Sequence, residues 1–395
     1  MNEIWIPRAL APQLEKALRQ FPAVLVSGAR QVGKTALCRH VWPDAQYVTL
    51  DLPAEAEAAR HDASAFLQRH PAPLIIDEIQ YAPELLRHLK VRVDRKRTPG
   101  QYLITGSQDF ALMQGVTESL SGRCAVLRLA TLGLGEVGAT TLAAIDALAW
   151  RGGWPELQAR PDLDRELWLG SYLATYLERD VRNILNVGSL RDFDRFLRAA
   201  AYRAGQLLSL SELARDVGIA VSTAKNWISL LLASHQIFLL EPWHVNPGKR
   251  LVKTPKLYFQ DVGFLLYLLG FRSWADVVAN PAWGAVWENM VVAECRKALV
   301  NAGRAASLYY WRTVNGEEVD LLVERGPRRV AAFEIKAAET TGKHDLKGLD
   351  AFARLYGRAA LERQAVVCRT PSRYPLGDHG AEALSLPEAI GEVGK

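Results

Sequence analysis

The chain has 395 residues, of which 49% are hydrophobic and 23% are charged, and its formal net charge is +5. This composition is that of an ordinary globular protein. It excludes a disordered, collagen-like or coiled-coil chain, and the length predicts two or three domains. The mild positive charge alone does not separate a nucleic-acid-binding protein from other basic enzymes.

Compartment and membrane contact follow from what the sequence lacks. The opening Met1 to Ile4 has no basic region followed by an apolar run, so no secretory signal is expected. The longest apolar stretches, at residues 228–233 and 263–271, are shorter than the roughly 20 residues that cross a bilayer. The four cysteines are scattered without CxxC or Cys/His spacing, which indicates neither a zinc site nor disulfides. We therefore expect a cytoplasmic protein with no membrane contact.

The first 155 residues have the pattern of a parallel α/β domain. A short apolar run at residues 23–27 enters a glycine loop, and residues 35–40 have the composition of a helix start. Further short apolar runs follow up to about residue 127, separated by helix-length segments. Nearly continuous apolar strands that alternate with helices predict a parallel sheet covered on both faces.

A phosphate-binding loop is predicted at residues 28–35, which read GARQVGKT and satisfy GxxxxGK[ST] between a strand and a helix. In such a loop, successive backbone amides and the start of the helix face the phosphates of a nucleotide. Lys34 would neutralise β- and γ-phosphate oxygens, and the Thr35 hydroxyl would coordinate Mg²⁺. The sequence thus predicts binding of ATP with Mg²⁺. The residues of the loop are Gly28, Ala29, Arg30, Gln31, Val32, Gly33, Lys34 and Thr35.

A second element matches the first. Residues 73–78 form an apolar run that ends in Asp77 and Glu78, which is a Walker B pattern. Asp77 would orient Mg²⁺ through its water shell, and Glu78 would polarise the attacking water or accept its proton. An apolar run followed by two acidic residues is weak evidence on its own. Together with the phosphate-binding loop, it predicts ATP hydrolysis.

Two further residues are candidates for catalysis. Ser107 follows the next predicted strand, where its hydroxyl could hold the hydrolytic water or sense the γ-phosphate. Arg123 lies about one helix later, where its charge could stabilise the transition state in a neighbouring subunit. The alternative for Arg123 is a surface arginine that pairs locally.

The middle of the chain is predicted to be helical and then to form a winged helix. Residues 156–204 have helical spacing without a strand-like run, and residues 205–260 contain a helix, a turn at Gly218 and a second helix. Strand-like residues 236–240 and 257–259 would supply a wing. Such a unit binds DNA or docks a protein, and the sequence favours DNA. The candidate DNA-binding residues are Ser222, Thr223, Lys225, Asn226, Lys249, Arg250 and Lys253.

Residues 261–395 have the order of a nuclease core. A long helix is followed by strands near 307–312, 318–324 and 329–337, and the middle pair is predicted as a hairpin. Glu288, Asp320, Glu334 and Lys336 follow the PD-(D/E)xK order, in which carboxylates hold Mg²⁺ and the lysine promotes hydroxide formation. The pattern is degenerate, so the acids could equally be kept for structure or binding.

Several of these motifs together resemble a known family. The motifs are GARQVGKT at 28–35, LIIDEIQ at 74–80, LITGS at 103–107, SGR at 121–123, GGWPE at 152–156, YLERD at 176–180 and KTPKLYF at 253–259 with Asp261. In this order they resemble bacterial and archaeal AAA-type ATPases fused to a C-terminal domain of unknown function. The resemblance implies an ATPase domain, a helix-turn-helix module and a restriction-endonuclease-like last domain. Trp154 stands where phenylalanine is expected.

Three hypotheses of function follow. The first is a Mg²⁺-dependent ATPase that binds DNA by structure more than by sequence, for example at branches or junctions, and remodels it. The second is an ATP-dependent regulatory module, as in toxin–antitoxin or defence systems, that acts on a protein partner. The third is an ATP-gated nuclease. We expect the protein to form a homo-oligomer, for which six subunits are one option.

Overall fold

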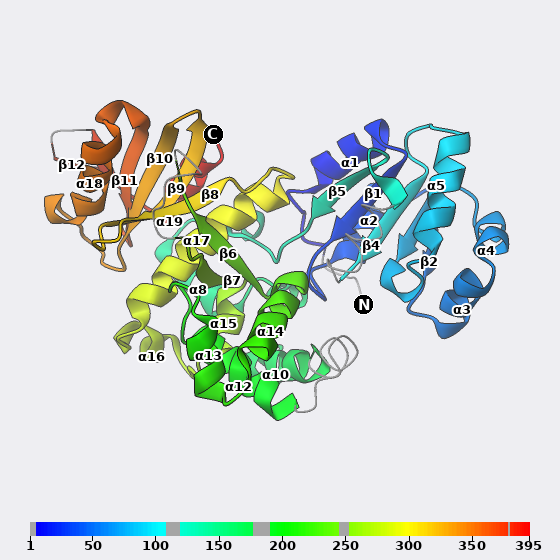
Figure 1. The fold of residues 1–395 in the computed structure, drawn as a ribbon, viewed down its shortest axis with the longest axis horizontal. Coiled ribbons are helices and arrows are strands. Elements are labelled where there is room, and N and C mark those ends of the chain that lie inside the picture. The colour runs from blue at the N-terminus through cyan, green and yellow to red at the C-terminus, as the bar shows by residue number, and fades with distance from the viewer. Residues whose placement is uncertain (1–4, 108–118, 177–189, 245–252, 378–379) are drawn as a thin grey trace.

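The computed structural model describes residues 5–107, 119–176, 190–244, 253–377 and 380–395. Its first region is an α/β domain around a five-stranded parallel sheet of order β2-β3-β4-β1-β5 (Figure 1). The elements are α1 (Ala11–Gln20), β1 (Ala23–Ser27), α2 (Lys34–Val41), β2 (Gln46–Thr49), α3 (Pro53–His61), α4 (Ala63–Arg69), β3 (Leu74–Asp77), the 3-10 helix η1 (Ile79–Tyr81), α5 (Leu85–Arg95), β4 (Tyr102–Gly106) and β5 (Cys124–Arg128).

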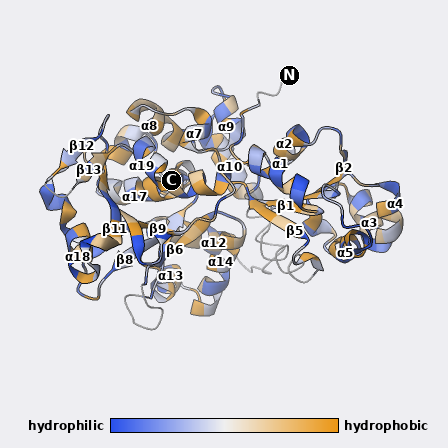
Figure 2. Ribbon diagram, turned by 90° about the horizontal axis from the view of Figure 1, so that it is seen from above, coloured by the Kyte–Doolittle hydropathy of each residue, from blue (hydrophilic) through white to orange (hydrophobic). Residues whose placement is uncertain are grey.

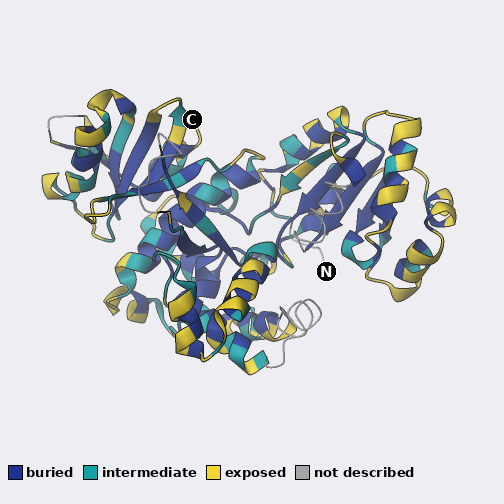
Figure 3. Ribbon diagram, in the orientation of Figure 1, coloured by how far each residue is buried: buried dark blue, intermediate teal, exposed yellow. Residues whose placement is uncertain are grey.

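Both faces of this sheet are covered, as the apolar strands predict. All residues of β1 and β4 are buried, and β1 is drawn mostly in hydrophobic colours in Figure 2. Because side chains alternate along a strand, Ala23 and Leu25 join the core under α3, α4 and α5. Val24 and Val26 join the core under α1 and α2. Figure 3 shows the buried strands between helices whose outer faces are exposed. The predicted parallel α/β domain is thus confirmed.

A helical region follows the sheet. Its elements, including two strands, are α7 (Leu134–Val137), α8 (Leu142–Arg151), α9 (Pro155–Ala159), α10 (Arg165–Tyr176), α12 (Leu190–Ala201), α13 (Leu210–Val217), α14 (Val221–Ala233), β6 (Ile237–Pro242), β7 (Lys256–Phe259), α15 (Val262–Leu268) and α16 (Trp274–Ala279). Trp154 packs among their aromatic side chains, with its ring centroid 4.9 Å from that of Tyr172 and 5.9 Å from that of Phe264. Among the described residues, no helix is long and apolar enough to cross a membrane.

The helix-turn-helix pair and its two strands do not stand apart from their neighbours. α13 ends at Gly218 in the left-handed conformation, with φ 83°, and α14 begins at Val221. β6 and β7 form an antiparallel hairpin, but β6 also pairs in parallel with a strand of the C-terminal sheet. The winged-helix arrangement of residues 205–260 stays a prediction, and the expected boundary after residue 260 falls beside strands that continue the next sheet.

The C-terminal region is built on an eight-stranded sheet of order β12-β13-β11-β10-β9-β8-β6-β7. β9 and β10 form the predicted antiparallel hairpin, and β10 pairs in parallel with β11. α17 and α19 contribute to the core on one face, and α18 covers the other. The elements are α17 (Trp283–Asn301), β8 (Leu308–Arg312), β9 (Glu318–Gly326), β10 (Arg329–Ile335), η3 (Lys343–Leu346), α18 (Lys347–Tyr356), η4 (Arg358–Ala360), β11 (Leu361–Val367), β12 (Tyr374–Leu376), β13 (Ala381–Leu384) and α19 (Leu386–Val393).

Candidate functional site

The phosphate-binding loop connects β1 to α2, as its sequence requires. Gly33 caps α2 with φ 89°, a backbone conformation that side chains with a Cβ rarely adopt. A Cβ on Gly28 would collide with the carbonyl oxygen of Leu129, which follows β5. The two motif glycines are therefore demanded by backbone geometry, and the loop curls in front of the start of α2.

Lys34 lies inside the curl of this loop. Its Nζ donates to the carbonyl oxygens of Gly28 at 3.0 Å and Ala29 at 2.9 Å. The residue is only 5% exposed, and burial lowers its pKa, while the nearby carboxylates of Glu78 and Asp77 act in the opposite direction. Both acceptors are neutral carbonyls, so the positive charge of Lys34 can be matched by an incoming anion such as phosphate.

Asp77 ends β3 beside the loop and is held by three hydroxyl groups. Thr35 Oγ1 lies 3.0 Å from both carboxylate oxygens, the Tyr47 hydroxyl donates to Oδ2 at 3.0 Å, and Thr105 also donates to the carboxylate. Burial, followed by the charge of Asp77, raises the pKa of Tyr47 to about 12. The Thr35 hydroxyl and the Asp77 carboxylate are hard oxygen ligands. Such a pair fits Mg²⁺, which usually keeps several of its water ligands in proteins.

Glu78 lies next to Asp77 and forms a cluster with Gln80 and Ser107. Glu78 has φ 58°, an uncommon backbone conformation for a residue with a side chain. The Gln80 amide donates to Glu78 and, at 3.1 Å, to Ser107 Oγ. Ser107 in turn donates to Glu78 Oε2 at 3.3 Å. The structure thus brings the predicted Glu78 and Ser107 together.

Three residues of this site were not among the predicted site residues: Tyr47, Gln80 and Thr105. Gln80 had a local signal, because it follows Glu78 by two residues across a short turn. Thr105 lies in β4, which pairs with β3, so strand order would have suggested it. Tyr47 lies on β2, and its approach to Asp77 depends on the β2–β3 pairing, which no local motif announces.

Arg123 lies at the amino end of the parallel strands, whereas the phosphate-binding loop of the same chain lies at their carboxyl end. It directly precedes β5, whose last residue, Arg128, pairs with Ser27 at the end of β1. The five residues of each strand separate these two ends of the sheet by about 17 Å. Arg123 instead contacts Asp94 on α5 through Nε at 2.5 Å and Nη2 at 3.0 Å, and this hydrogen bonding lowers the pKa of Asp94. The predicted role of Arg123 in a neighbouring subunit stays a prediction.

A second candidate site is an open cleft of about 940 Å³ between the β9–β10 hairpin and α18. Asp320, Glu334 and Lys336 all line this cleft, as their sequence spacing predicts. Lys336 Nζ lies 3.3 Å from Glu334 Oε2, and Asp320 Oδ2 accepts from the amide of Ile335 at 2.8 Å. Burial, followed by the charge of Asp320, raises the pKa of Glu334 to about 8.

Glu288 is bound differently from the metal ligand that was expected. Its Oε1 accepts from Lys256 Nζ at 2.8 Å and from the Tyr258 hydroxyl at 2.6 Å. Lys256 also pairs with Glu318. Although burial opposes its charge, the carboxylates of Glu288, Asp320 and Glu318 raise the pKa of Lys256. The buried ammonium therefore occupies the place beside Glu288 where a cation would bind.

The magnesium site predicted from Asp320 and Glu334, with Glu288 and Lys336 as further members, stays a prediction. Glu288 is close enough for Asp320 to raise its pKa, after burial as the main cause. Across the described part of the chain, however, no three His, Cys, Asp or Glu side chains are grouped so that they could hold a metal ion. Of these carboxylates, Glu288 already pairs with the buried ammonium of Lys256, which also contacts Glu318.

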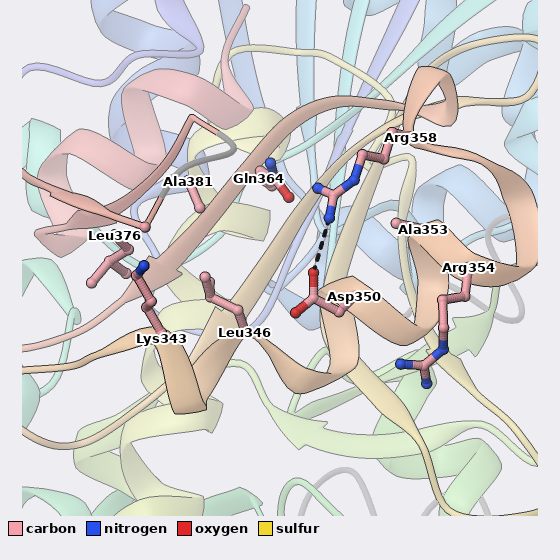
Figure 4. Close-up of a pocket in the computed structure, with 10 residues that line it drawn as sticks. Lys343, Leu346, Asp350, Ala353, Arg354, Arg358, Gln364, Leu376 and Ala381 are labelled. Atoms are coloured by element: carbon pink, nitrogen blue, oxygen red, sulfur yellow. Dashed lines mark ion pairs between the residues drawn. The ribbon is translucent and has the colours of Figure 1, made fainter.

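A smaller hollow of about 460 Å³ is lined in part by side chains of α18 (Figure 4). It shares Asp350 and Arg354 with the cleft. Arg358 reaches over it and pairs with Asp350 at 3.5 Å. Cationic side chains of the C-terminal domain thus gather near the carboxylates of the cleft, although acidic neighbours partly neutralise them.

The predicted DNA-binding residues lie mainly on one face of α14. Ser222, Lys225 and Asn226 are exposed, and Thr223 is half-buried. Lys253 is exposed shortly before β7. Lys249 and Arg250 lie outside the described residues, as do residues 177–180 of the YLERD motif.

Comparison with known proteins identifies the parts of the chain. Residues 20–138 match the AAA domain family, and residues 142–275 and 283–389 match domains of unknown function, DUF8612 and DUF4143. The uncharacterized proteins Mb2031c of Mycobacterium bovis and Rv2008c of Mycobacterium tuberculosis are each 35% identical over 380 residues, which is 94% of this chain and 82% of theirs. The chain belongs to the same family as these two mycobacterial proteins. The AAA-type identity of the N-terminal domain is thereby confirmed, and the nuclease-like identity of the C-terminal domain stays a prediction.

Solved structures with a similar chain trace are distant. The Walker-type ATPase PABY2304 of Pyrococcus abyssi has a TM-score of 0.45 and 17% identity, covering 68% of this chain and 97% of that one. Domain III of the replication initiation protein DnaA of Thermotoga maritima has a TM-score of 0.24 and 13% identity, covering 55% and 88% of the two chains.

Proposed function

We propose that the protein is a Mg²⁺-dependent ATPase that binds DNA and couples ATP hydrolysis to DNA remodelling. The observation that carries the ATPase part is the contact of Thr35 Oγ1 with Asp77 at 3.0 Å, directly beside the buried ammonium of Lys34. A hydroxyl, a carboxylate and an ammonium at the start of a helix are what a magnesium–triphosphate complex requires.

Each residue of the site has a role in this proposal. The loop amides and the start of α2 bind phosphate oxygens, and Lys34 exchanges its carbonyl contacts for β- and γ-phosphate oxygens. Thr35 and Asp77 would hold Mg²⁺, which offsets the charge of the phosphates when it is bound. Glu78 accepts a proton from the attacking water, while Gln80 and Ser107 fix the position of its carboxylate.

DNA binding is proposed for the exposed face of α14. This face offers small polar groups and the single ammonium of Lys225, with Lys253 nearby in sequence before β7. Such a face makes few base contacts, which favours recognition of DNA structure over sequence. Arg123, at the far edge of its own AAA sheet, would serve the nucleotide of a neighbouring subunit in a homo-oligomer.

The test is the ATPase rate, with the oligomer mass, measured with and without duplex, single-stranded and junction DNA. The proposal predicts that at least one DNA form raises turnover and that Lys34→Ala abolishes it. Lys336→Ala is the matched control, since it removes an ammonium far from the loop. If no DNA binds or changes the rate while a specific protein co-purifies, the regulatory module acting on a protein partner replaces the DNA hypothesis.

A nuclease activity is a second candidate, favoured by the shared cleft of Asp320, Glu334 and Lys336. The three side chains have the types and the spacing of a phosphodiesterase site, and arginines lie close by. Cleavage of branched, single-stranded and duplex DNA with Mg²⁺ and ATP tests this candidate. Cleavage that is lost in Asp320→Ala supports it, and no cleavage of any substrate by the wild type rejects it.

A further inference from the structure

A buried arginine outside the loop motif holds the phosphate-binding loop. Arg8 is 5% exposed, and its Nη1 donates to the carbonyl oxygen of Val32 at 2.6 Å, while Nη2 donates to that of Ala130 at 2.7 Å. Val32 directly precedes the glycine that caps α2. Arg8 therefore ties the last turn of the loop to the segment that leaves the sheet after β5.

Glu136 links Arg8 to the C-terminal domain. Its side chain is 6% exposed. Oε1 accepts from Arg8 Nε at 3.0 Å, and Oε2 accepts from Asn301 Nδ2 at 2.8 Å. Asn301 is the last residue of α17, and its Oδ1 also accepts from the amide of Ala130 at 3.0 Å. One carboxylate thus joins the arginine behind the loop to the end of a helix in the C-terminal domain.

A buried ionic cluster, formed by Asp261, Glu294 and Lys297, fixes α17 one to two turns further back. Lys297 Nζ lies 2.8 Å from Glu294 Oε1 and 3.8 Å from Asp261 Oδ2. Glu294 Oε2 accepts from the amide of Leu134 at 2.9 Å. Burial opposes the charge of Lys297, but the carboxylates of Glu294 and Asp261 raise its pKa above the usual value. The helix is therefore clamped to the start of α7 and, through Lys297 and the carbonyl oxygen of Leu132, to the segment before it.

The opposite half of α17 is linked to the C-terminal cleft through Lys256. Glu288 lies 13 residues before Asn301, which is about 20 Å along the helix, and it bonds Lys256 and Tyr258 beside the cleft. Figure 1 shows α17 running from the C-terminal domain toward the AAA domain. A single helix thus contacts the support of the phosphate-binding loop near one end and, near the other, Lys256, which pairs with Glu318 in the lining of the cleft.

We propose that Arg8, Glu136 and Asn301 are positioning residues that couple the phosphate-binding loop to α17, so that nucleotide binding is sensed at the C-terminal cleft. The inference rests on the proposed ATP binding. When phosphates replace the loop carbonyls around Lys34, the loop that carries Val32 adjusts, and Arg8 and Glu136 pass the adjustment to Asn301 because all three are buried and directly bonded.

The test is hydrogen exchange of the backbone amides of α17 in the full chain, with and without Mg²⁺ and a non-hydrolysable ATP analogue. In the wild type, the analogue slows exchange in α17 about fivefold or more, the lower range of coupling between distinct sites. In Asn301→Ala, the analogue still binds with an affinity within about threefold of wild type, but the slowing in α17 is lost. Glu78→Gln is the control that keeps the slowing, because it removes catalysis alone.

Arg8→Lys supplies an independent readout. A lysine keeps the charge but cannot bond Val32, Ala130 and Glu136 at once. We expect KM for ATP to rise about tenfold while kcat stays within about twofold, with the melting temperature monitored to show that the variant is folded.

Two outcomes overturn the inference. The first is bound analogue that leaves exchange in α17 unchanged in the wild type, and the second is an Asn301→Ala variant that keeps the full slowing. Failure of the wild type to bind any adenine nucleotide would instead overturn the proposed function, so the two failures are distinguishable.

Discussion

The nucleotide site and the C-terminal cleft both contain carboxylates at the ends of strands, but their charges are balanced in different ways. In the nucleotide site, Asp77 is held by three neutral hydroxyl groups, and Lys34 is held by two neutral carbonyls. Beside the cleft, Glu288 is paired with Lys256, and in the cleft Glu334 lies 3.3 Å from Lys336. The first site leaves its charges for a ligand, whereas the second satisfies many of its own.

This difference teaches that the partners of a carboxylate, more than its place in a motif, decide whether it can hold a metal. A carboxylate held by hydroxyl donors keeps its negative charge for Mg²⁺. One that already touches a buried ammonium must give up that pair before a metal gains access, at the cost of leaving the ammonium unpaired.

The largest expected effect is on catalysis at the nucleotide site. Glu78→Gln removes the proton acceptor but keeps the size of the side chain, so kcat should fall by about 100-fold to 10,000-fold while ATP affinity changes little. Steady-state ATPase assays and nucleotide binding measure the two effects. Glu334→Gln is the matched control in the cleft, and an equal loss of turnover in both variants would remove the distinction between the sites.

The next effect is on the helix that joins the two regions. Lys297→Met leaves the buried carboxylates of Glu294 and Asp261 without their ammonium, and the side chain of Lys297 is only 2% exposed. We expect a loss of about 3 to 5 kcal/mol in the free energy of unfolding. Denaturant unfolding measures it, with the exposed Lys395→Met as control. A loss below about 1 kcal/mol would show that the cluster contributes little.

A smaller effect is expected beside the cleft. Lys256→Ala leaves Glu288 and Glu318 without a shared cation, so the melting temperature should fall. Mg²⁺ or Mn²⁺ without nucleotide should then raise it by several degrees, because a divalent cation can take the place of the ammonium. Thermal unfolding with and without the metal measures this rescue. Equal responses of variant and wild type to the metal would contradict the view that Lys256 occupies the cation position.

The pH dependence of stability gives a further comparison. Because the pKa of Glu334 is about 8 in the fold and about 4.3 in an unfolded chain, the native state keeps a proton that the unfolded state has released between these values. Stability therefore falls as pH rises from about 5 to 8. Glu334→Gln should lose less melting temperature over this range than wild type, by a few degrees, in calorimetry with EDTA. The same dependence of melting temperature on pH in the variant and the wild type would contradict the raised pKa of Glu334.

The smallest effect is expected on DNA binding. Lys225 is one exposed ammonium on α14, so Lys225→Gln should weaken binding of every DNA form to a similar extent and reduce the salt slope of log K by about one. Fluorescence anisotropy across a salt series measures this slope. Asn226→Ala is the control without a charge change, and an unchanged slope in Lys225→Gln would place the DNA contacts elsewhere.

Local sequence could predict the parts of the fold and of the candidate site that are formed by residues close together in the chain. Residues 28–35 form one continuous loop, and Asp77 ends β3 with Glu78 directly after it, so the AAA fold and the position of these residues follow from the sequence. Glu334 and Lys336 reached the same cleft as Asp320 because a hairpin joins their strands.

The parts that sequence could not predict depend on contacts between distant elements. Lys256 meets Glu288 across 32 residues, and Arg8 meets Glu136 across 128 residues. The continuation of β6 into the C-terminal sheet likewise depends on pairing with β8. No periodicity or motif specifies these partners, since each arises from the way that whole elements pack.

The central claim is that the curled loop of residues 28–35 grips a magnesium–triphosphate complex. Calorimetric titration of the wild type and of Lys34→Ala with ATP and Mg²⁺ tests it most directly, with thermal unfolding to show that both are folded. The account predicts saturable binding of one nucleotide per chain in the wild type and affinity at least about 100-fold weaker in the variant. Folded wild type that releases no heat, or a variant that binds equally well, would contradict it.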